Sequence, residues 1–481
     1  DVKVYPHKTI EAGANVTQSL IYETMGLRTI FKGGVVTGKF NVNLTPEFVT
    51  RLASSFGTTL DPGAVVTLGR DSSRAAQVAK RAMTAALLGT GINIRDLRAA
   101  HAGVVRHDVL SGRSSAGAHV RAGADPDDVE ILFFASEATP MTEGDQRSVE
   151  KAFVREEYRR AHGEDIGDLI YPGRVVEQFV ERLERVVDRE KTSGATIVVD
   201  FYGGVAGLVA SRVFSRLGVG AVVMEGFANA NVVSSGPGAD LRESVDRVAR
   251  IVPTVGAAFG AVVGPEAERV RFVDDEGRLV PDDVMLACLI RATRPRKAVF
   301  PINLSNGYRS LTEEGGGTVE ISRTGIGNLA LRAADVRADL ASLADGRYIF
   351  SSFLPAPDCF MTIARALEAF RSEPLSGLRR DFDEPFGNVV RERLECPWTA
   401  KGRVMRGLAE KFGGDPDAIL TEGVRLSVDG GWVLMLPDPD NPVFYVYAEP
   451  GDGGDPHALA GDYVDLVRSL IEEGTSAETS S

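Results

Sequence analysis

The stretch ATIVVDFYGGVAGLVASRVFSRLGVGAVVM, residues 195–224, decides the class of fold. It begins with a β-branched run, passes a glycine turn, continues with apolar residues at helical spacing and ends in a second β-branched run. A strand, a helix and a strand in this order predict two parallel strands joined by a crossover helix. Gly203, Gly204 and Gly207 do not form GxGxxG, so we interpret them as a tight strand-to-helix turn and not as a dinucleotide site.

The same alternation occurs on both sides of this stretch. Thr45 is a predicted N-cap with Pro46 in the first turn of its helix, and the strand AVVTLGRD (64–71) follows. The segment KAVFPINLSNG (297–307) opens a third unit of this kind. Strands that alternate with helices predict a mostly parallel sheet in each unit. Near the C-terminus, β-rich runs around Gly430–Gly431 predict a hairpin and an α+β unit.

Composition excludes several classes of protein. A chain of 481 residues is too long for one core and predicts three or four domains. The formal charge of −13, without clustered Lys or Arg, argues against nucleic acid, and no apolar run is long enough to cross a membrane. The three cysteines lack the spacing of a disulfide framework or a zinc site, which favours a cytoplasmic location; they are Cys288, Cys359 and Cys396.

The first 31 residues follow a different pattern. Val4, Ile10 and Val16 recur every six residues, which is typical of a parallel β-helix. Such a coil needs about three turns to bury a core. We therefore expect residues 1–31 to be the end of a longer β-helix, and a chain that starts at Asp1 to be a fragment. A chance period in an N-terminal arm is the alternative.

The order of segments resembles the α-D-phosphohexomutase superfamily, the phosphomannomutases and phosphoglucomutases, over roughly residues 33–473. Five segments carry the resemblance: NLTPEFVTRLASSFGTTL (43–60), TLGRDSSR (67–74), RFVDDEGRLVPDDVMLACLI (271–290), ISRTGIGN (321–328) and GWVLMLPDPDNPVFYVYAE (431–449). The resemblance implies an α/β fold of four domains around one cleft, three α/β and the fourth α+β, preceded here by the end of a left-handed β-helix.

The resemblance also implies domain boundaries. We expect the β-helix end at 1–31, domain I at 32–171, domain II at 172–293, domain III at 294–375, domain IV at 376–473 and a disordered tail at 474–481.

The four loops that serve catalysis in this family differ here. Members carry T-A-S-H-N-P, whose serine is phosphorylated and donates its phosphoryl group. The corresponding stretch is HVRAGADPDD (119–128), in which Gly123 takes the place of the serine and Ala124 that of the histidine, followed by Asp125. Ser114 and Ser115 precede the strand that leads into this loop. Arg70 is retained, and its alternative role is a salt bridge to Asp71 or a helix terminus.

The family's metal loop, D-G-D-A-D-R, corresponds to GPEAER (264–269). Gly264 replaces the first aspartate, while Glu266, Glu268 and Arg269 keep charges of the same sign. Because Mg²⁺ requires near-octahedral oxygen ligands, the loss of one ligand should weaken its binding greatly. We expect no metal and no other cofactor, with Mg²⁺ required only if the chain is an active mutase.

The family's two substrate loops are also altered. The sugar loop, G-E-x-S-G-H, corresponds to SLADGR (342–347), with Asp345, Gly346 and Arg347 at its end. The phosphate loop, R-P-S-G-T-E-P, corresponds to LPDPDNP (436–442). There the phosphate-binding arginine is replaced by an apolar residue, and carboxylates that repel phosphate are added; the altered positions are Leu436, Asp438, Asp440 and Asn441.

From these losses we predict a catalytically degenerate phosphohexomutase-fold region. It would scaffold or regulate a sugar-nucleotide pyrophosphorylase of the mannose-1-phosphate guanylyltransferase type, which makes GDP-mannose. The expected partners are an upstream nucleotidyltransferase domain of the same polypeptide and further copies of the chain, with no nucleic acid and no membrane.

Two alternatives stay open. One is an active mutase that interconverts hexose 1-phosphate and 6-phosphate by a divergent mechanism. The other is a ligand sensor with an acidic cleft, formed by Asp125, Asp127, Asp128, Glu266, Asp438 and Asp440.

Overall fold

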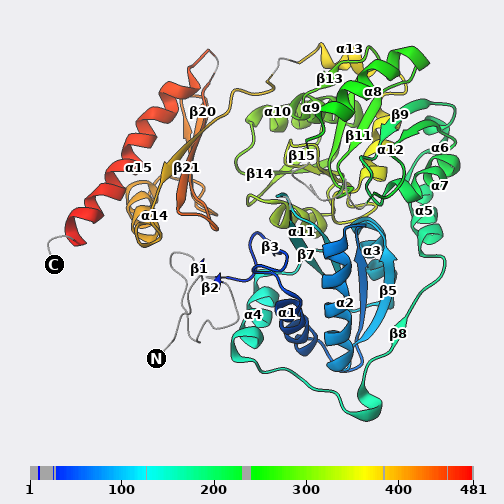
Figure 1. Ribbon diagram of the computed structural model, residues 1–481. Helices are drawn as coiled ribbons and strands as arrows, with labels where there is room; N and C mark the ends of the chain where they lie inside the picture. Colours follow the sequence, from blue (N-terminus) through cyan, green and yellow to red (C-terminus); the bar gives the residue numbers. More distant parts are fainter. Residues whose placement is uncertain are drawn as a thin grey trace.

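The described part of the chain forms four sheets of four or more strands, each flanked by helices (Figure 1). The computed structural model describes residues 29–125, 127–229, 240–382, 385–451 and 453–478, and the backbone of two short strands near the N-terminus. These two strands, β1 (Thr9–Ile10) and β2 (Met25–Gly26), pair in parallel. The remainder of the predicted β-helix end lies outside the described residues.

The first sheet has six strands in the order β3-β7-β6-β4-β5-β8. Its centre is parallel, since β4 pairs in parallel with both β5 and β6, while β7 runs antiparallel to β6 and β3. The strands are β3 (Val35–Lys39), β4 (Val65–Arg70), β5 (Asn93–Ala99), β6 (Ala116–Ala122), β7 (Asp128–Ala135) and β8 (Leu169–Ile170). Every residue of β6 is buried, which fits the position of this strand in the middle of the sheet.

Helices cover both faces of this sheet. They are α1 (Pro46–Thr59), α2 (Arg74–Gly89), α3 (Ala102–Asp108), the π-helical turn η1 (Val109–Arg113), α4 (Glu143–Arg155) and the 3-10 turn η2 (Gly163–Asp165). The predicted start of α1 is confirmed, because the Thr45 side chain accepts a hydrogen bond from Phe48 N and Pro46 is the first helical residue. Ser73 caps α2 in the same way by accepting from Ala76 N.

The second and third sheets continue the mixed pattern. The second has the order β10-β9-β11-β12-β13, and the third β15-β14-β16-β17. Their strands are β9 (Thr196–Asp200), β10 (Gly220–Met224), β11 (Gly260–Val263), β12 (Val270–Val273), β13 (Leu279–Val280), β14 (Lys297–Pro301), β15 (Thr318–Ser322), β16 (Leu340–Ser342) and β17 (Tyr348–Ile349). The predicted parallel pair within 195–224 is confirmed as β9 and β10.

One hydrophobic core runs through these units. Ala100 and Val104 of the first unit belong to the same buried cluster as the phenylalanines of the second and third. The helices that contribute to this cluster are α5 (Val175–Val186), α7 (Gly207–Leu217), α9 (Asp282–Thr293), α10 (Asn306–Glu314), α12 (Cys359–Ala369) and α13 (Leu375–Arg379). Two further helices, α8 (Arg242–Val255) and α11 (Ile326–Val336), pack in smaller clusters of their own, and α6 (Arg189–Thr192) is a short helix after α5. Continuous burial of apolar surface holds the three units in a fixed arrangement.

The fourth sheet is antiparallel, with the order β18-β21-β20-β19, and has a core of its own. Its elements are β18 (Val390–Glu395), α14 (Trp398–Phe412), β19 (Val424–Val428), β20 (Gly431–Pro437), β21 (Val443–Glu449) and α15 (Pro456–Glu478). The predicted hairpin is confirmed as β19–β20, which turns through Asp429 and Gly430 at positive φ. Residues 474–478 are helical where a disordered tail is predicted.

The predicted domain boundaries stay predictions. In the described part of the chain, no helix has the length and apolar character needed to span a bilayer. Figure 1 shows the fourth unit to one side of the other three.

A candidate active-site cleft

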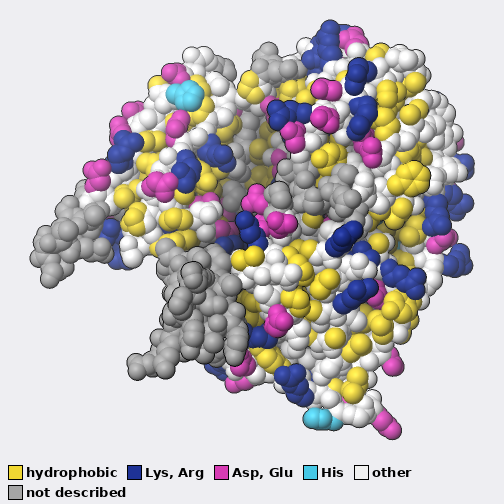
Figure 2. All heavy atoms as spheres, in the orientation of Figure 1, with side chains coloured by type: hydrophobic (Ala, Val, Ile, Leu, Met, Phe, Trp, Pro, Cys, Tyr) yellow, Lys and Arg dark blue, Asp and Glu magenta, His cyan; other side chains and the backbone are white. Residues whose placement is uncertain are grey.

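A cavity of about 770 Å³ lies where the first, third and fourth units meet. Its walls come from the segment before β3, the start of α4, the turn between β15 and α11, the helix α14 and the loop after β20. Figure 2 shows a hollow between the fourth unit and the remainder, with basic and acidic side chains at its rim. A concave site at the junction of several units is where small ligands most often bind.

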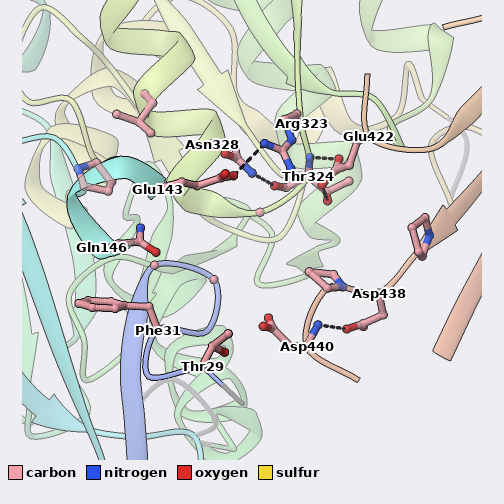
Figure 3. Close-up of a pocket in the computed structure, with 18 of the residues that line it drawn as sticks. Thr29, Phe31, Glu143, Gln146, Arg323, Thr324, Asn328, Glu422, Asp438 and Asp440 are labelled. Carbon is pink, nitrogen blue, oxygen red and sulfur yellow. Dashed lines mark hydrogen bonds and ion pairs between the residues drawn. The ribbon is translucent and has the colours of Figure 1, made fainter. Parts of the chain in front are cut away.

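The turn between β15 and α11 is tied to both of its neighbours. Arg323 Nη1 lies 2.9 Å from Glu143 Oε1, so an ion pair crosses from the third unit to α4 (Figure 3). Thr324 donates from its main-chain N and its hydroxyl to the Glu422 carboxylate, at 2.6 and 2.7 Å. Asn328 donates to Thr324 O at 2.8 Å. The turn therefore forms a fixed wall of the cleft.

The loop that corresponds to the phosphate loop lines the opposite wall. Asp438 Oδ1 accepts from Asp440 N and Asn441 N, both at 2.8 Å, which folds the loop onto itself. Lys401, from α14, donates to the main-chain oxygens of Asp438 and Asn441 and lies over the Trp398 ring. This lysine brings a buried positive charge to the loop in which Leu436 replaces the expected arginine.

Leu436 itself does not line the cavity. It is buried with Ile302, Trp432 and Leu434 where the third and fourth sheets pack together. The substitution therefore extends an apolar contact between the two sheets.

The loop that corresponds to the phosphoserine loop leaves β6 at Ala122. Ala122 N donates to Asp71 Oδ2 at 2.7 Å, and Gly123 N donates to Asp128 O at 2.7 Å. A Cβ at position 123 would lie 2.6 Å from the Asp128 Cβ, closer than side chains tolerate. The loop is thus shaped around the glycine. Ser114 is at the opposite end of β6, where its hydroxyl lies 2.7 Å from Thr67 Oγ1.

The acidic loop between β11 and β12 packs against this unit. Glu266 and Glu268 are both buried, and Glu268 Oε2 lies 3.1 Å from Arg121 Nη1 of β6. Burial raises the pKa of Glu266, whereas the neighbouring Arg121 and Arg106 outweigh burial and lower the pKa of Glu268. In the described residues no three His, Cys, Asp or Glu side chains are grouped to hold a metal. These residues do not fit the Mg²⁺ site that the resemblance implies.

The loop that corresponds to the sugar loop adjoins the acidic loop. Arg269 Nε donates to Asp345 O at 3.0 Å, and Arg347 Nε donates to Asp345 Oδ2 at 2.9 Å. Gly346 O accepts from Val270 N at 2.8 Å. The predicted residues of these two loops are therefore brought together.

Arg70 ends β4 and makes a local contact. Its Nη1 donates to the main-chain oxygen of Asp71 at 2.5 Å. Burial lowers its pKa, while Asp71 and Asp96 oppose this effect. Of the predicted site residues, only Asp438 and Asp440 line the cavity of Figure 3.

Sequence reasoning did not find several residues at these sites. Arg121 stands two positions before Gly123 on a strand of small and apolar residues, and that contrast is a usable signal. Arg323 and Thr324 lie in ISRTGIGN (321–328), one of the segments that carry the resemblance, but sequence alone assigned these two residues no specific role. Lys401 offered no signal, because its contacts depend on the packing of α14 against a distant loop.

Comparisons with known proteins support the fold. The family model for phosphoglucomutase/phosphomannomutase alpha/beta/alpha domain I matches residues 28–160, and that for domain II matches residues 177–277. A solved phosphoglucomutase/phosphomannomutase family protein from Burkholderia thailandensis superposes with a TM-score of 0.75 at 19% identity, covering 92% of this chain and 97% of that one. A putative phosphomannomutase from Thermus thermophilus gives 0.69 at 18%, covering 93% and 98%.

Two curated relatives match along nearly their whole length. The phosphoglucomutase/phosphomannomutase of Thermococcus kodakarensis is 25% identical over 453 residues, covering 91% of this chain and 97% of the relative. The "Probable phosphoglucosamine mutase" of Methanopyrus kandleri is 27% identical over 462 residues, with the same coverage.

These relatives overturn the main functional prediction from the sequence. That prediction, a non-catalytic region serving a mannose-1-phosphate guanylyltransferase, is wrong, because proteins similar over 91% of the chain are named as mutases. The prediction rested on the altered loop residues, whereas the five segments that carry the resemblance are spread along the chain. The two family models, which match residues 28–160 and 177–277, place this chain in the α-D-phosphohexomutase superfamily, and the structural neighbours share its fold.

Proposed function

We propose that this protein is a phosphohexomutase that interconverts the 1-phosphate and 6-phosphate of a hexose or an aminohexose. The observation that carries this proposal is the similarity to relatives named as mutases over 91% of the chain. The aligned region is not limited to one domain, and it includes the segments that form the walls of the cleft.

The cleft supports a phosphorylated sugar as ligand. Arg323 and Lys401 bring positive charge to opposite walls, and Phe31 and Trp398 offer apolar faces between them. A sugar ring can pack on aromatic faces while a phosphate is held by cations and main-chain N–H groups. The backbone at Gly33, Gly34, Gly325 and Gly327 lines the same cavity without side chains in the way.

The group that accepts the phosphoryl group is not at position 123. Among the described residues, Ser72 Oγ is a buried hydroxyl with no hydrogen-bond partner, which is uncommon in a folded protein. Ser72 follows Asp71, whose carboxylate holds Ala122 N. We propose Ser72 as the first residue to test as acceptor. A new P–O bond would form at Oγ as the P–O bond to the donor sugar breaks, and the Oγ–H proton would pass to the departing sugar oxygen, which leaves as a hydroxyl.

Phosphorus-31 NMR of glucose 1-phosphate with a trace of glucose 1,6-bisphosphate tests the function. The proposal predicts growth of the glucose 6-phosphate signal with the folded protein and none in its absence. Unchanged spectra for glucose, mannose and glucosamine 1-phosphates would contradict it.

Peptide mass analysis after incubation with the bisphosphate tests the acceptor. Phosphate on the peptide with Ser72, lost in Ser72→Ala and retained in Ser115→Ala, is the expected result. Ser115 is a suitable control, because it is exposed and precedes β6.

The N-terminal β-helix end and a cytoplasmic location are also proposed. The parallel pairing of β1 with β2 supports the first, and three buried cysteines without disulfides support the second.

A further inference from the structure

A buried guanidinium lies beside the loop that corresponds to the family's metal loop. Arg121 is 7% exposed, and its neighbours are Glu130 on β7 and Glu268 on the β11–β12 loop. Its Nε donates to Glu130 Oε2 at 2.8 Å, and its Nη1 lies 3.1 Å from Glu268 Oε2. We call these three residues together with Glu266 the Arg121 cluster. The cluster joins the first sheet to the second.

The charges in the cluster compensate one another. Burial alone would lower the pKa of Arg121, but the carboxylates of Glu268, Glu130 and Glu266 outweigh it and raise that pKa above its usual value. The guanidinium is thus permanently charged. A buried charge is tolerated only when partners replace the lost hydration, and here Arg121 pairs directly with Glu130 and Glu268.

The loop has no room for a further ligand at its first position. Gly264 has no side chain, and a Cβ there would lie 2.5 Å from both carboxylate oxygens of Glu266. Glu268 is already engaged by Arg121. A divalent cation would need oxygen ligands that this loop lacks, and it would have to enter next to a fixed positive charge.

We propose that Arg121 permanently supplies the positive charge that a divalent cation would supply at this position, so that the Arg121 cluster binds no metal. Arg121 lies two residues before Gly123, on the strand that leads into the loop where the resemblance places the phosphoryl donor. Glu268 lies four residues after Gly264, in the loop where the resemblance places the metal. The ion pair between Arg121 and Glu268 therefore joins these two parts of the chain. A role of Arg121 in stabilising a phosphoryl group during transfer rests on the proposed function. The absence of metal from the Arg121 cluster does not rest on it.

Thermal unfolding with and without metal tests the inference without any substrate. The melting temperature of the wild-type protein should be the same in EDTA and in millimolar Mg²⁺ or Mn²⁺. Arg121→Ala removes the cation that pairs with the buried Glu268 and lies near the buried Glu266, so the variant should melt several degrees lower and be partly restored by Mn²⁺.

Arg95→Ala is the matched control. Arg95, on β5 of the same sheet as Arg121, pairs at 2.7 Å with the buried Asp108 at the end of α3, away from the acidic loop. Its loss should lower the melting temperature without any restoration by Mn²⁺. If Arg121→Ala does not fold, Arg121→Lys keeps the charge and should remain indifferent to metal.

Three results would overturn the inference: a wild-type melting temperature that rises with Mg²⁺ or falls with EDTA, Mn²⁺ binding to the wild-type protein in a calorimetric titration, or an Arg121→Ala protein that folds and ignores Mn²⁺. Indifference to metal together with a failed mutase assay would remove only the role in phosphoryl transfer.

Discussion

The Glu449 carboxylate, at the end of β21, accepts a hydrogen bond from the main-chain N of Asn306, 2.8 Å away on the third unit. The same carboxylate accepts from the Ser305 hydroxyl and the Trp432 indole, and Arg425 reaches Asn306 from the fourth unit. These contacts fix the fourth unit, and with it the loop at Asp438, relative to the other three. Glu449 is therefore a positioning residue for the cleft.

Glu449→Ala should destabilise the protein by about 2 kcal/mol or more, because three donors lose their acceptor and two of them, on Ser305 and Trp432, are buried. Glu449→Gln keeps an acceptor of the same shape and should cost less. Urea unfolding measures both free energies, and small-angle scattering reports whether the fourth unit becomes more mobile. An alanine variant as stable as the wild type would show that the apolar contact around Trp432 is sufficient.

Lys401→Met should raise the KM for the hexose phosphate about tenfold and change kcat less. The substitution removes the donor that holds the main-chain oxygens of Asp438 and Asn441, so the loop loses its fixed conformation. Lys411→Met, an exposed change on the same helix, is the control and should leave KM unchanged. Equal KM values for the two variants would remove Lys401 from the binding site.

Gly123→Ala should lower stability by about 1–3 kcal/mol, since the added Cβ would collide with Asp128. Gly89→Ala has open space around its Cβ and lies at the end of α2, so it should be neutral or slightly stabilising. Chemical unfolding of both variants provides the comparison. If Gly123→Ala is as stable as Gly89→Ala, the loop is more adaptable than its contacts indicate.

Asp358 should make stability depend on pH. Its Oδ1 caps α12 by accepting from Phe360 N and Met361 N, both at 3.0 Å, while Oδ2 faces His101 at 3.9 Å. Burial, with Glu268 nearby, raises its pKa from 3.8 to about 7. The folded state therefore keeps a proton that the unfolded state releases. The resulting stabilisation is complete below the lower value and is lost as the pH rises through about 7.

Asp358→Asn retains a capping oxygen and does not ionise. Its melting temperature relative to the wild type should thus be higher at about pH 8 than at about pH 5. Burial lowers the pKa of His101 to about 4 and of His119 to about 3. This produces acid sensitivity in both proteins, which cancels in the comparison. The same difference at both pH values would rule out ionisation of Asp358 in this range.

The elements that sequence predicts well are those set by local chemistry. Thr45 and Pro46 start α1, and the β-branched runs of 195–224 become β9 and β10, because caps, turns and periodicity act over a few residues. The cluster around Arg121 and the burial of Leu436 arise from packing between sheets, which no local pattern encodes. For this reason the loop residues, read without their surroundings, pointed to lost function.

The rate of 6-phosphate formation from glucose, mannose and glucosamine 1-phosphates, measured with the wild type and with the Arg323→Ala/Lys401→Met double variant, tests the mutase assignment most directly. The assignment predicts turnover of at least one sugar by the wild type and a loss of about tenfold or more in kcat/KM in the double variant. Arg147→Ala, which removes the other arginine beside Glu143, should retain the wild-type rate. No turnover of any of the three sugars by the folded protein, or equal rates in the wild type and the double variant, would contradict it.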